Sequence, residues 1–420
     1  MRRPNVQPYS KYDVASLGKS LNSMCIMLET LDVRESKSID LTIGFLLKPL
    51  LAMMKLTGLY YEHSSKPDKQ KQNRLHLVYC IFVCFLSWSN TLRFISIFFL
   101  TNFKHKAEQY LPLLMTTLVA QLWLLLCSCS HTTFIISSYQ RNKFYTIMFN
   151  YNFCKLIKCQ PGISKRFKFG IYSTITLCLI TILSNTLALL IAYFGPSKYM
   201  KVFQMFLTPF HQKSTITHNI PYKLFICLLH FYASAAWILP PTLFCILCLI
   251  GCSEFEKFNE YIKQEVQQSN AQERVEYWRQ SHSRLIKLVH ALDSTFQIYV
   301  SLALSINIVM AFLMLYIIAM MWTHRLDLDL GPLFIVMVNF WAFCSMFYVF
   351  VVSATAGVLN SVTRGSLTYL HQLPATGCSI DFNTQVLGIC IGTGIEILIS
   401  TDAWRQRLNS GLEGKAQYIC

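Results

Sequence analysis

Four polar side chains interrupt long apolar stretches of this sequence, at positions where a hydrogen-bonding group needs a partner. They are Gln121, Asn185, His230 and Asn339. If the stretches cross a membrane, such groups face a bundle interior, a cavity or a partner, because lipid offers them no hydrogen bonds. Aromatic residues occur at similar depth along the same stretches: Trp123, Tyr193, Tyr232, Trp237, Tyr316 and Trp341. This combination predicts a pocket for a small neutral polar or amphipathic ligand. The candidate ligand-binding residues are Gln121, Asn185, His230, Trp237, Tyr316 and Asn339.

A second interpretation of the same residues stays open. Tyrosine and tryptophan concentrate at membrane interfaces in any membrane protein, and single amides often join neighbouring helices. Arg93, near the end of the first apolar stretch, also has two interpretations: it either has a functional role or extends its side chain to the lipid headgroups. Pro240 and Pro241 should kink the stretch that contains them, which is consistent with gating and equally with packing.

Catalytic and metal-binding patterns are not found in the sequence. Cys245 and Cys248 have the spacing of half a zinc site, but they lie in an apolar helix with no second pair nearby, which favours packing. Gly388, Gly392 and Gly394 do not match the spacing of nucleotide-binding loops. We therefore expect neither an enzyme nor a bound cofactor or metal.

The elements that position the polar residues are membrane helices. Of the 420 residues, 53% are apolar and only 14% are charged, against about 25% in soluble domains. Mean hydropathy is +0.39. Hydropathy predicts an all-α polytopic membrane protein with six spans, at residues 75–101, 110–138, 169–195, 222–252, 294–322 and 331–358.

Loop charge orients these spans. The segments on one side, residues 1–74, 139–168 and 253–293, hold 25 Lys and Arg, while the loops on the other side hold 6. By the positive-inside rule, the N-terminus is cytoplasmic. The net charge of +16 therefore orients the chain and does not indicate a nucleic-acid partner.

Two cytoplasmic features follow from this topology. Within residues 1–74, where we expect no signal peptide, residues 41–61 are apolar but interrupted by Lys48, Pro49, Lys55 and Gly58. This pattern predicts a short helix at the membrane surface, and the alternative is a failed or marginal span. Residues 277–321 change at Asp293 from an amphipathic pattern to a charge-free one without Gly or Pro. We expect one continuous helix there, so residues 253–293 form a cytoplasmic helical region that extends the fourth and fifth spans.

Several short motifs, in this order, resemble the arthropod gustatory receptor family. They are Lys48-Pro-Leu-Leu with Gly58-Leu-Tyr, Asn90 with Arg93, the 247–260 segment LCLIGCSEFEKFNE, Trp278-Arg279 with His282, Leu288-Val289 and Asp293, then Asn307. The resemblance covers roughly residues 40–386 and is closest to the sugar-sensing branch, with Leu373-Pro374 after the sixth span.

The resemblance implies a seven-helix subunit of a tetrameric ligand-gated cation channel, unrelated to G-protein-coupled receptors. A small-molecule tastant would bind between the exterior halves of the helices. The partners would be membrane lipid and like or related subunits, and the seventh helix would line the pore.

The C-terminal part departs from that family. Its seventh helix carries Thr-Tyr and Gln-Phe, whereas residues 388–400 form a 13-residue apolar run containing Glu396. At about 1.5 Å per residue this run is too short to cross a bilayer. We expect residues 359–420 to form a cytoplasmic connector and tail, and the chain alone not to conduct. The alternatives are a G-protein-coupled-type receptor, which the charge pattern opposes, and a transporter, for which repeated halves and a buried acid are not found.

Overall fold

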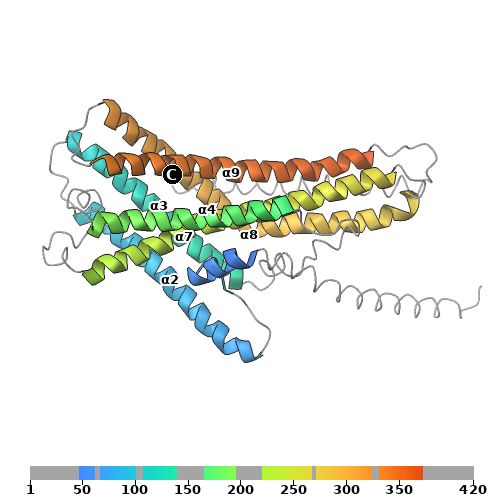
Figure 1. The fold of residues 1–420 in the computed structure, drawn as a ribbon, viewed down its shortest axis with the longest axis horizontal. Helices are drawn as coiled ribbons and strands as arrows, with labels where there is room; N and C mark the ends of the chain where they lie inside the picture. Colours follow the sequence, from blue (N-terminus) through green and yellow to red (C-terminus); the bar gives the residue numbers. More distant parts are fainter. Residues whose placement is uncertain are drawn as a thin grey trace, which may run out of the picture.

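The computed structural model describes residues 47–61, 67–100, 107–139, 165–194, 220–266, 271–323 and 331–371. Every long element among them is an α-helix (Figure 1). In order these are α2 (Pro67–Leu100), α3 (Ala107–Tyr139), α4 (Lys165–Phe194), α7 (Ile220–Val266), α8 (Ala271–Thr323) and α9 (Gly331–His371). Each of the six is long and apolar enough to cross a membrane. The predicted all-α fold with six spans is confirmed for the described part of the chain.

The helix α7 is the centre of the bundle, because it packs against each of the other five. Ala235, Ala236 and Leu239 on α7 are completely buried. Small residues such as Ala235 and Ala236 let neighbouring helix backbones approach closely in a membrane, where van der Waals contact replaces the hydrophobic effect between helices. The helix also continues through Pro240 and Pro241.

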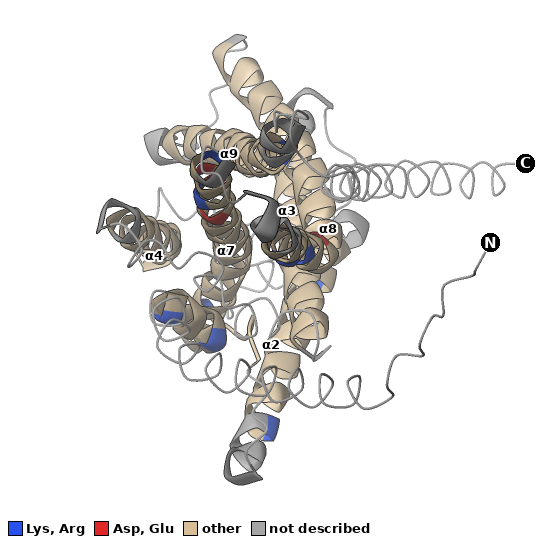
Figure 2. Cartoon of the chain, turned by 90° about the vertical axis from the view of Figure 1, so that its right-hand side faces the viewer, with Lys and Arg blue, Asp and Glu red and all other residues tan. Residues whose placement is uncertain are grey.

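The outer surface of the bundle is apolar. Large side chains such as Leu177, Phe312 and Phe350 are more than 60% exposed. In Figure 2, seen along the bundle, most of the described helical surface carries neither acidic nor basic residues. An apolar exterior of this extent would aggregate in water and is the surface that a bilayer covers.

Helices α7, α8 and α9 extend beyond one end of the bundle (Figure 1). The continuous helix expected around residues 277–321 is part of α8, whose 53 residues would span about 80 Å at 1.5 Å per residue. The extension is packed: Trp278 and Phe258 are about 1% exposed, and Asn259 Nδ2 donates to the carbonyl oxygen of Val362 at 3.3 Å. Helix α9 continues to His371. The sequence predicts a connector over residues 359–371, so this helix is longer than expected. Packing against the extension of α7 supplies contacts that the polar sequence does not reveal.

Residues 47–61 form a helix over 47–56 followed by a turn at Gly58, whose φ is +73°. The apolar side of this segment contacts protein, since Leu47, Leu50 and Met54 are fully buried. His131 Nε2 lies 3.3 Å from the Thr57 carbonyl oxygen, and the Tyr79 hydroxyl donates to the Leu56 carbonyl. The sequence predicted contact with the membrane surface, but the segment is docked onto α2 and α3.

Candidate functional site

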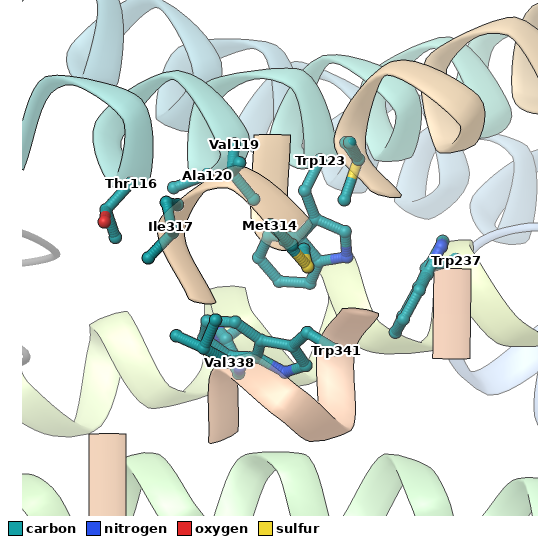
Figure 3. Close-up of a pocket in the computed structure, with 11 residues that line it drawn as sticks. Thr116, Val119, Ala120, Trp123, Trp237, Met314, Ile317, Val338 and Trp341 are labelled. Atoms are coloured by element: carbon teal, nitrogen blue, oxygen red, sulfur yellow. The ribbon is translucent and has the colours of Figure 1, made fainter. Parts of the chain in front are cut away.

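An enclosed cavity lies between α3, α7, α8 and α9 (Figure 3). The α3 residues approach from one side and the α9 residues from another, and the indole rings of Trp123 and Trp341 point into the space between. The lining residues are Thr116, Val119, Ala120, Trp123, His230, Trp237, Met310, Met314, Ile317, Val338 and Trp341.

His230 is one of the few polar residues of the lining, together with Thr116 and the tryptophan indoles. The rings of His230 and Trp123 lie 4.9 Å apart with an interplanar angle of 49°, and both side chains are less than 10% exposed. A tilted aromatic pair at this distance is favourable and fixes both rings. His230 is therefore held against Trp123 while its ring still lines the cavity.

Trp237 is held by an amide on α8. Its indole nitrogen donates to Asn307 Oδ1 at 3.3 Å, and Asn307 Nδ2 donates to the Ala303 carbonyl oxygen of its own helix at 2.8 Å. Asn307 is completely buried. The amide thus orients one aromatic wall from outside the cavity and connects α7 to α8.

Trp341 is held in the same way from α4. Its indole nitrogen donates to Asn185 Oδ1 at 3.3 Å, while Asn185 Nδ2 donates to Ser234 Oγ at 2.7 Å. One amide therefore joins α4, α7 and α9. Because a buried amide without partners costs free energy in an apolar interior, these contacts fix the relative positions of three helices and of the Trp341 ring.

The cavity has a volume of about 30 Å³, which leaves room for about one water molecule. Pockets for small organic ligands are usually about 300 Å³ or larger. A ligand must therefore displace lining side chains or separate helices. Met310 and Met314 are suited to this, because the unbranched methionine side chain readily adopts other shapes. Occupancy of this cavity would be coupled to a change in the helix bundle.

The sequence-predicted residues separate into two groups. His230 and Trp237 line the cavity, whereas Asn185 lies behind its wall and Gln121 points away, with Nε2 3.5 Å from the Thr91 carbonyl oxygen. Tyr316 is 40% exposed and does not line the cavity. Asn339 is exposed and donates to the Ile335 carbonyl oxygen of its own helix at 2.8 Å.

Trp123 and Trp341 were predicted only as neighbours, yet both are walls of the cavity. The other lining residues are apolar or Thr116, and sequence reasoning missed them. Helical periodicity could have placed Met310, Met314 and Ile317 on one face of α8, but it does not distinguish a cavity-lining face from a packed one.

A second and wider cavity, of about 210 Å³, opens between α4, α7 and α9. It is lined mainly by apolar residues, including Leu177, Ile238 and Phe347, and Trp237 lies between it and the enclosed cavity. Cys178 and Thr242 hydrogen bond across it at 3.1 Å. Its lining offers fewer ring contacts than the enclosed cavity, which remains the better candidate for specific binding.

Among the described residues, no group of three or more His, Cys, Asp or Glu side chains is placed to hold a metal ion. Cys245 and Cys248 are both free thiols on α7. The lining of the enclosed cavity offers a shaped apolar surface, aromatic contacts and a few hydrogen-bonding groups.

Comparison with known proteins identifies the fold. No protein-family model matches the chain, and no curated protein matches it. The structure is similar to that of the insect olfactory receptor OR5 from Machilis hrabei, with a TM-score of 0.57 and 12% identity over 83% of this chain and 88% of that one. The complex of that receptor with eugenol gives a TM-score of 0.58 and 14% identity over the same shares. The chain therefore has the fold of these receptors.

Proposed function

We propose that this chain is a chemoreceptor subunit of a ligand-gated cation channel, of gustatory type, in the plasma membrane with its N-terminus in the cytoplasm. One observation carries the proposal: an enclosed aromatic cavity lies within a fold shared with an insect olfactory receptor that has been solved with eugenol bound. The gustatory assignment is supported by the sequence motifs, and the orientation by the distribution of loop charge.

The ligand is a small amphipathic molecule that carries one or two hydrogen-bonding groups. Thr116 and His230 are the polar non-indole residues of the lining, and the remaining residues are aromatic or aliphatic. A sugar would bury many hydroxyl groups against this lining, and each hydroxyl without a partner costs about 1–3 kcal/mol by protein mutational data. The lining thus favours a molecule of eugenol's class over a polyhydroxylated one, although the sequence is closest to the sugar-sensing branch.

Gating follows from the small size of the empty cavity. Because a ligand enters by displacing lining side chains or by separating helices, it binds an expanded state of the cavity more tightly and shifts the population toward that state. Three of the helices around the cavity continue into the packed extension, so the displacement can reach the region where we expect like or related subunits to assemble as a tetramer.

The proposal is tested by expressing the chain with a conducting subunit of the same fold and recording ligand-evoked cation current. The probes are eugenol, as an aromatic amphiphile, and a disaccharide. His230→Phe keeps the ring packing on Trp123 and removes the imidazole nitrogens. We expect it to raise the half-maximal concentration of the active amphiphile about tenfold with unchanged surface expression. His290→Phe, at an exposed position of α8, is the matched control.

Currents that are unchanged by His230→Phe and by Trp237→Phe would contradict the assignment of this cavity. Activation by the disaccharide alone would contradict the ligand class. Residues 386–420, on which the expected silence of the chain alone depends, lie outside the described residues. Recording the chain without its partner subunit tests that expectation separately.

A further inference from the structure

Basic and tyrosine side chains gather at the end of the bundle where α4 ends and α7 begins. Arg93 of α2, Tyr193 of α4, and Tyr222 and Lys223 of α7 belong to this group. Arg93 Nη1 donates to the Tyr222 hydroxyl at 3.5 Å, and Lys223 Nζ donates to the Tyr193 carbonyl oxygen at 3.1 Å. Three helices therefore bring two cations and two phenols together, away from the candidate ligand cavity.

The guanidinium group has a fixed orientation. Asn90 Oδ1 accepts hydrogen bonds from Arg93 Nε at 3.1 Å and from Nη2 at 2.8 Å. Asn90 is buried, and Arg93 is half-buried. Because one edge of the guanidinium is occupied by the amide, the Nη1 side is directed toward α4 and α7. Such a preoriented planar donor suits an oxygen anion.

Tyr193 supplies a second observation. Its side chain is 3% exposed, and its hydroxyl group has no hydrogen-bond partner among the described residues. It lies close enough to Arg93 for the two groups to interact electrostatically. A buried hydroxyl without a protein partner is rare in native structures and calls for a water molecule, an ion or a ligand to satisfy it.

The position of the group along the helices matches the lipid headgroups. Tyr193 lies one residue before the end of α4, and Lys223 lies in the first turn of α7. Arg93 lies about two turns before the end of α2 at Leu100, from where its long side chain can reach the headgroups. Phosphate groups of a bilayer lie at this depth. The described acidic side chains, Glu254, Glu256, Glu260 and Asp293, belong to the opposite part of α7 and α8.

We propose that Arg93, Lys223, Tyr193 and Tyr222 form a binding site for the phosphate group of a membrane lipid. The cations supply charge, the oriented guanidinium supplies directional donors, and the Tyr193 hydroxyl supplies a buried donor. Lys223 also interacts with the Phe194 ring at 5.6 Å and with the C-terminal end of α4, where a cation is favourable. A bound phosphate would connect α2, α4 and α7 at their ends and stabilise the bundle.

The test measures lipid binding to the full chain, purified in detergent and depleted of lipid, by native mass spectrometry and thermal unfolding. The probes are dioleoyl phosphatidic acid, dioleoylglycerol with the same acyl chains, and inorganic phosphate. We expect phosphatidic acid to bind and to raise the unfolding temperature, and the other two to have little effect. Arg93→Gln and Lys223→Gln should each weaken phosphatidic acid binding about tenfold, and Tyr193→Phe should weaken it severalfold.

Arg284→Gln changes the net charge equally at an exposed position of α8 and should leave lipid binding unchanged. Equal stabilisation by dioleoylglycerol would overturn the proposal, because acyl-chain contact would then explain it. Equal stabilisation by inorganic phosphate would overturn the assignment to a lipid. If Arg93→Gln does not fold, the Lys223 and Tyr193 variants decide the question, and wild-type binding by both would refute the site.

Discussion

Replacing Asn185 with leucine should weaken both the bundle and the ligand response, although Asn185 does not line the cavity. The substitution removes the hydrogen bonds from Trp341 Nε1 and to Ser234 Oγ. Leucine has the same branching at Cγ and the same number of side-chain heavy atoms as asparagine, so the packing of α4 is largely retained. The Ser234 hydroxyl can turn to a carbonyl of its own helix, as serine often does, but the Trp341 N–H loses its acceptor.

The magnitude follows from the two lost contacts. Hydrogen bonds between membrane helices contribute on average about 0.6 kcal/mol each, with a maximum of about 1.7 kcal/mol. The expected loss of stability is therefore about 1–2 kcal/mol. If the freed Trp341 ring costs the bound state a similar amount, the half-maximal ligand concentration rises roughly five- to thirtyfold, since about 1.4 kcal/mol corresponds to a factor of ten.

A double-mutant cycle with Trp341→Phe measures the contact itself. Phenylalanine keeps an aromatic ring and lacks the N–H, so the combined variant should lose less stability than the sum of the single variants, by about 0.6–1.7 kcal/mol. Thermal unfolding in detergent and dose–response curves provide the two readouts. Asn339→Leu is the matched control, because Asn339 is exposed and bonds only to Ile335 of its own helix among the described contacts.

Additive effects of Asn185→Leu and Trp341→Phe would refute the argument that one residue positions the other. A loss of ligand response without any loss of stability would also refute it, because Asn185 would then have to contact the ligand directly. An effect of Asn339→Leu as large as that of Asn185→Leu would show that burial does not decide the outcome.

Three further predictions follow from the docked segment and the topology. Gly58→Ala should destabilise the protein by about 1–3 kcal/mol in thermal unfolding, because φ is +73° and the new Cβ would lie 2.9 Å from Val83 Cβ. Gly357→Ala is the control and should be neutral or stabilising, because a Cβ at that position would have no atom within 4 Å. His131→Leu should lower the free energy of unfolding by about 1–2 kcal/mol, because the hydrogen bond to the Thr57 carbonyl oxygen is lost. It should also make residues 47–61 more sensitive to limited proteolysis. His290→Leu, at an exposed position, should have neither effect. An epitope at the N-terminus should be stained only after cells are permeabilised, and staining of intact cells would contradict the cytoplasmic orientation.

Much of the fold could be predicted because each membrane helix satisfies its own backbone. Inside a bilayer a long charge-free segment has few alternatives to a helix, so the apolar runs gave the six spans, and the absence of Gly and Pro around Asp293 predicted that α8 continues without a break. The length of α9 beyond residue 358 could not be predicted, because polar residues there form helix only through packing on α7. For residues 41–61 the sequence predicted a short helix at the membrane surface; residues 47–56 are helical with their apolar side packed on protein, and residues 41–46 lie outside the described part of the chain.

The sequence by itself determined which residues are costly in a membrane, since that depends only on side-chain chemistry and on the hydropathy of the neighbours. It therefore selected His230, Asn185 and Asn339 alike. Only the tertiary structure decided their roles: His230 packs on Trp123 in the cavity lining, Asn185 holds Trp341 from behind, and Asn339 bonds to its own helix on the surface. The physical reason is that the rotation of each helix about its axis is fixed by close packing against α7 and its neighbours, and a periodic sequence allows several rotations that packing reduces to one.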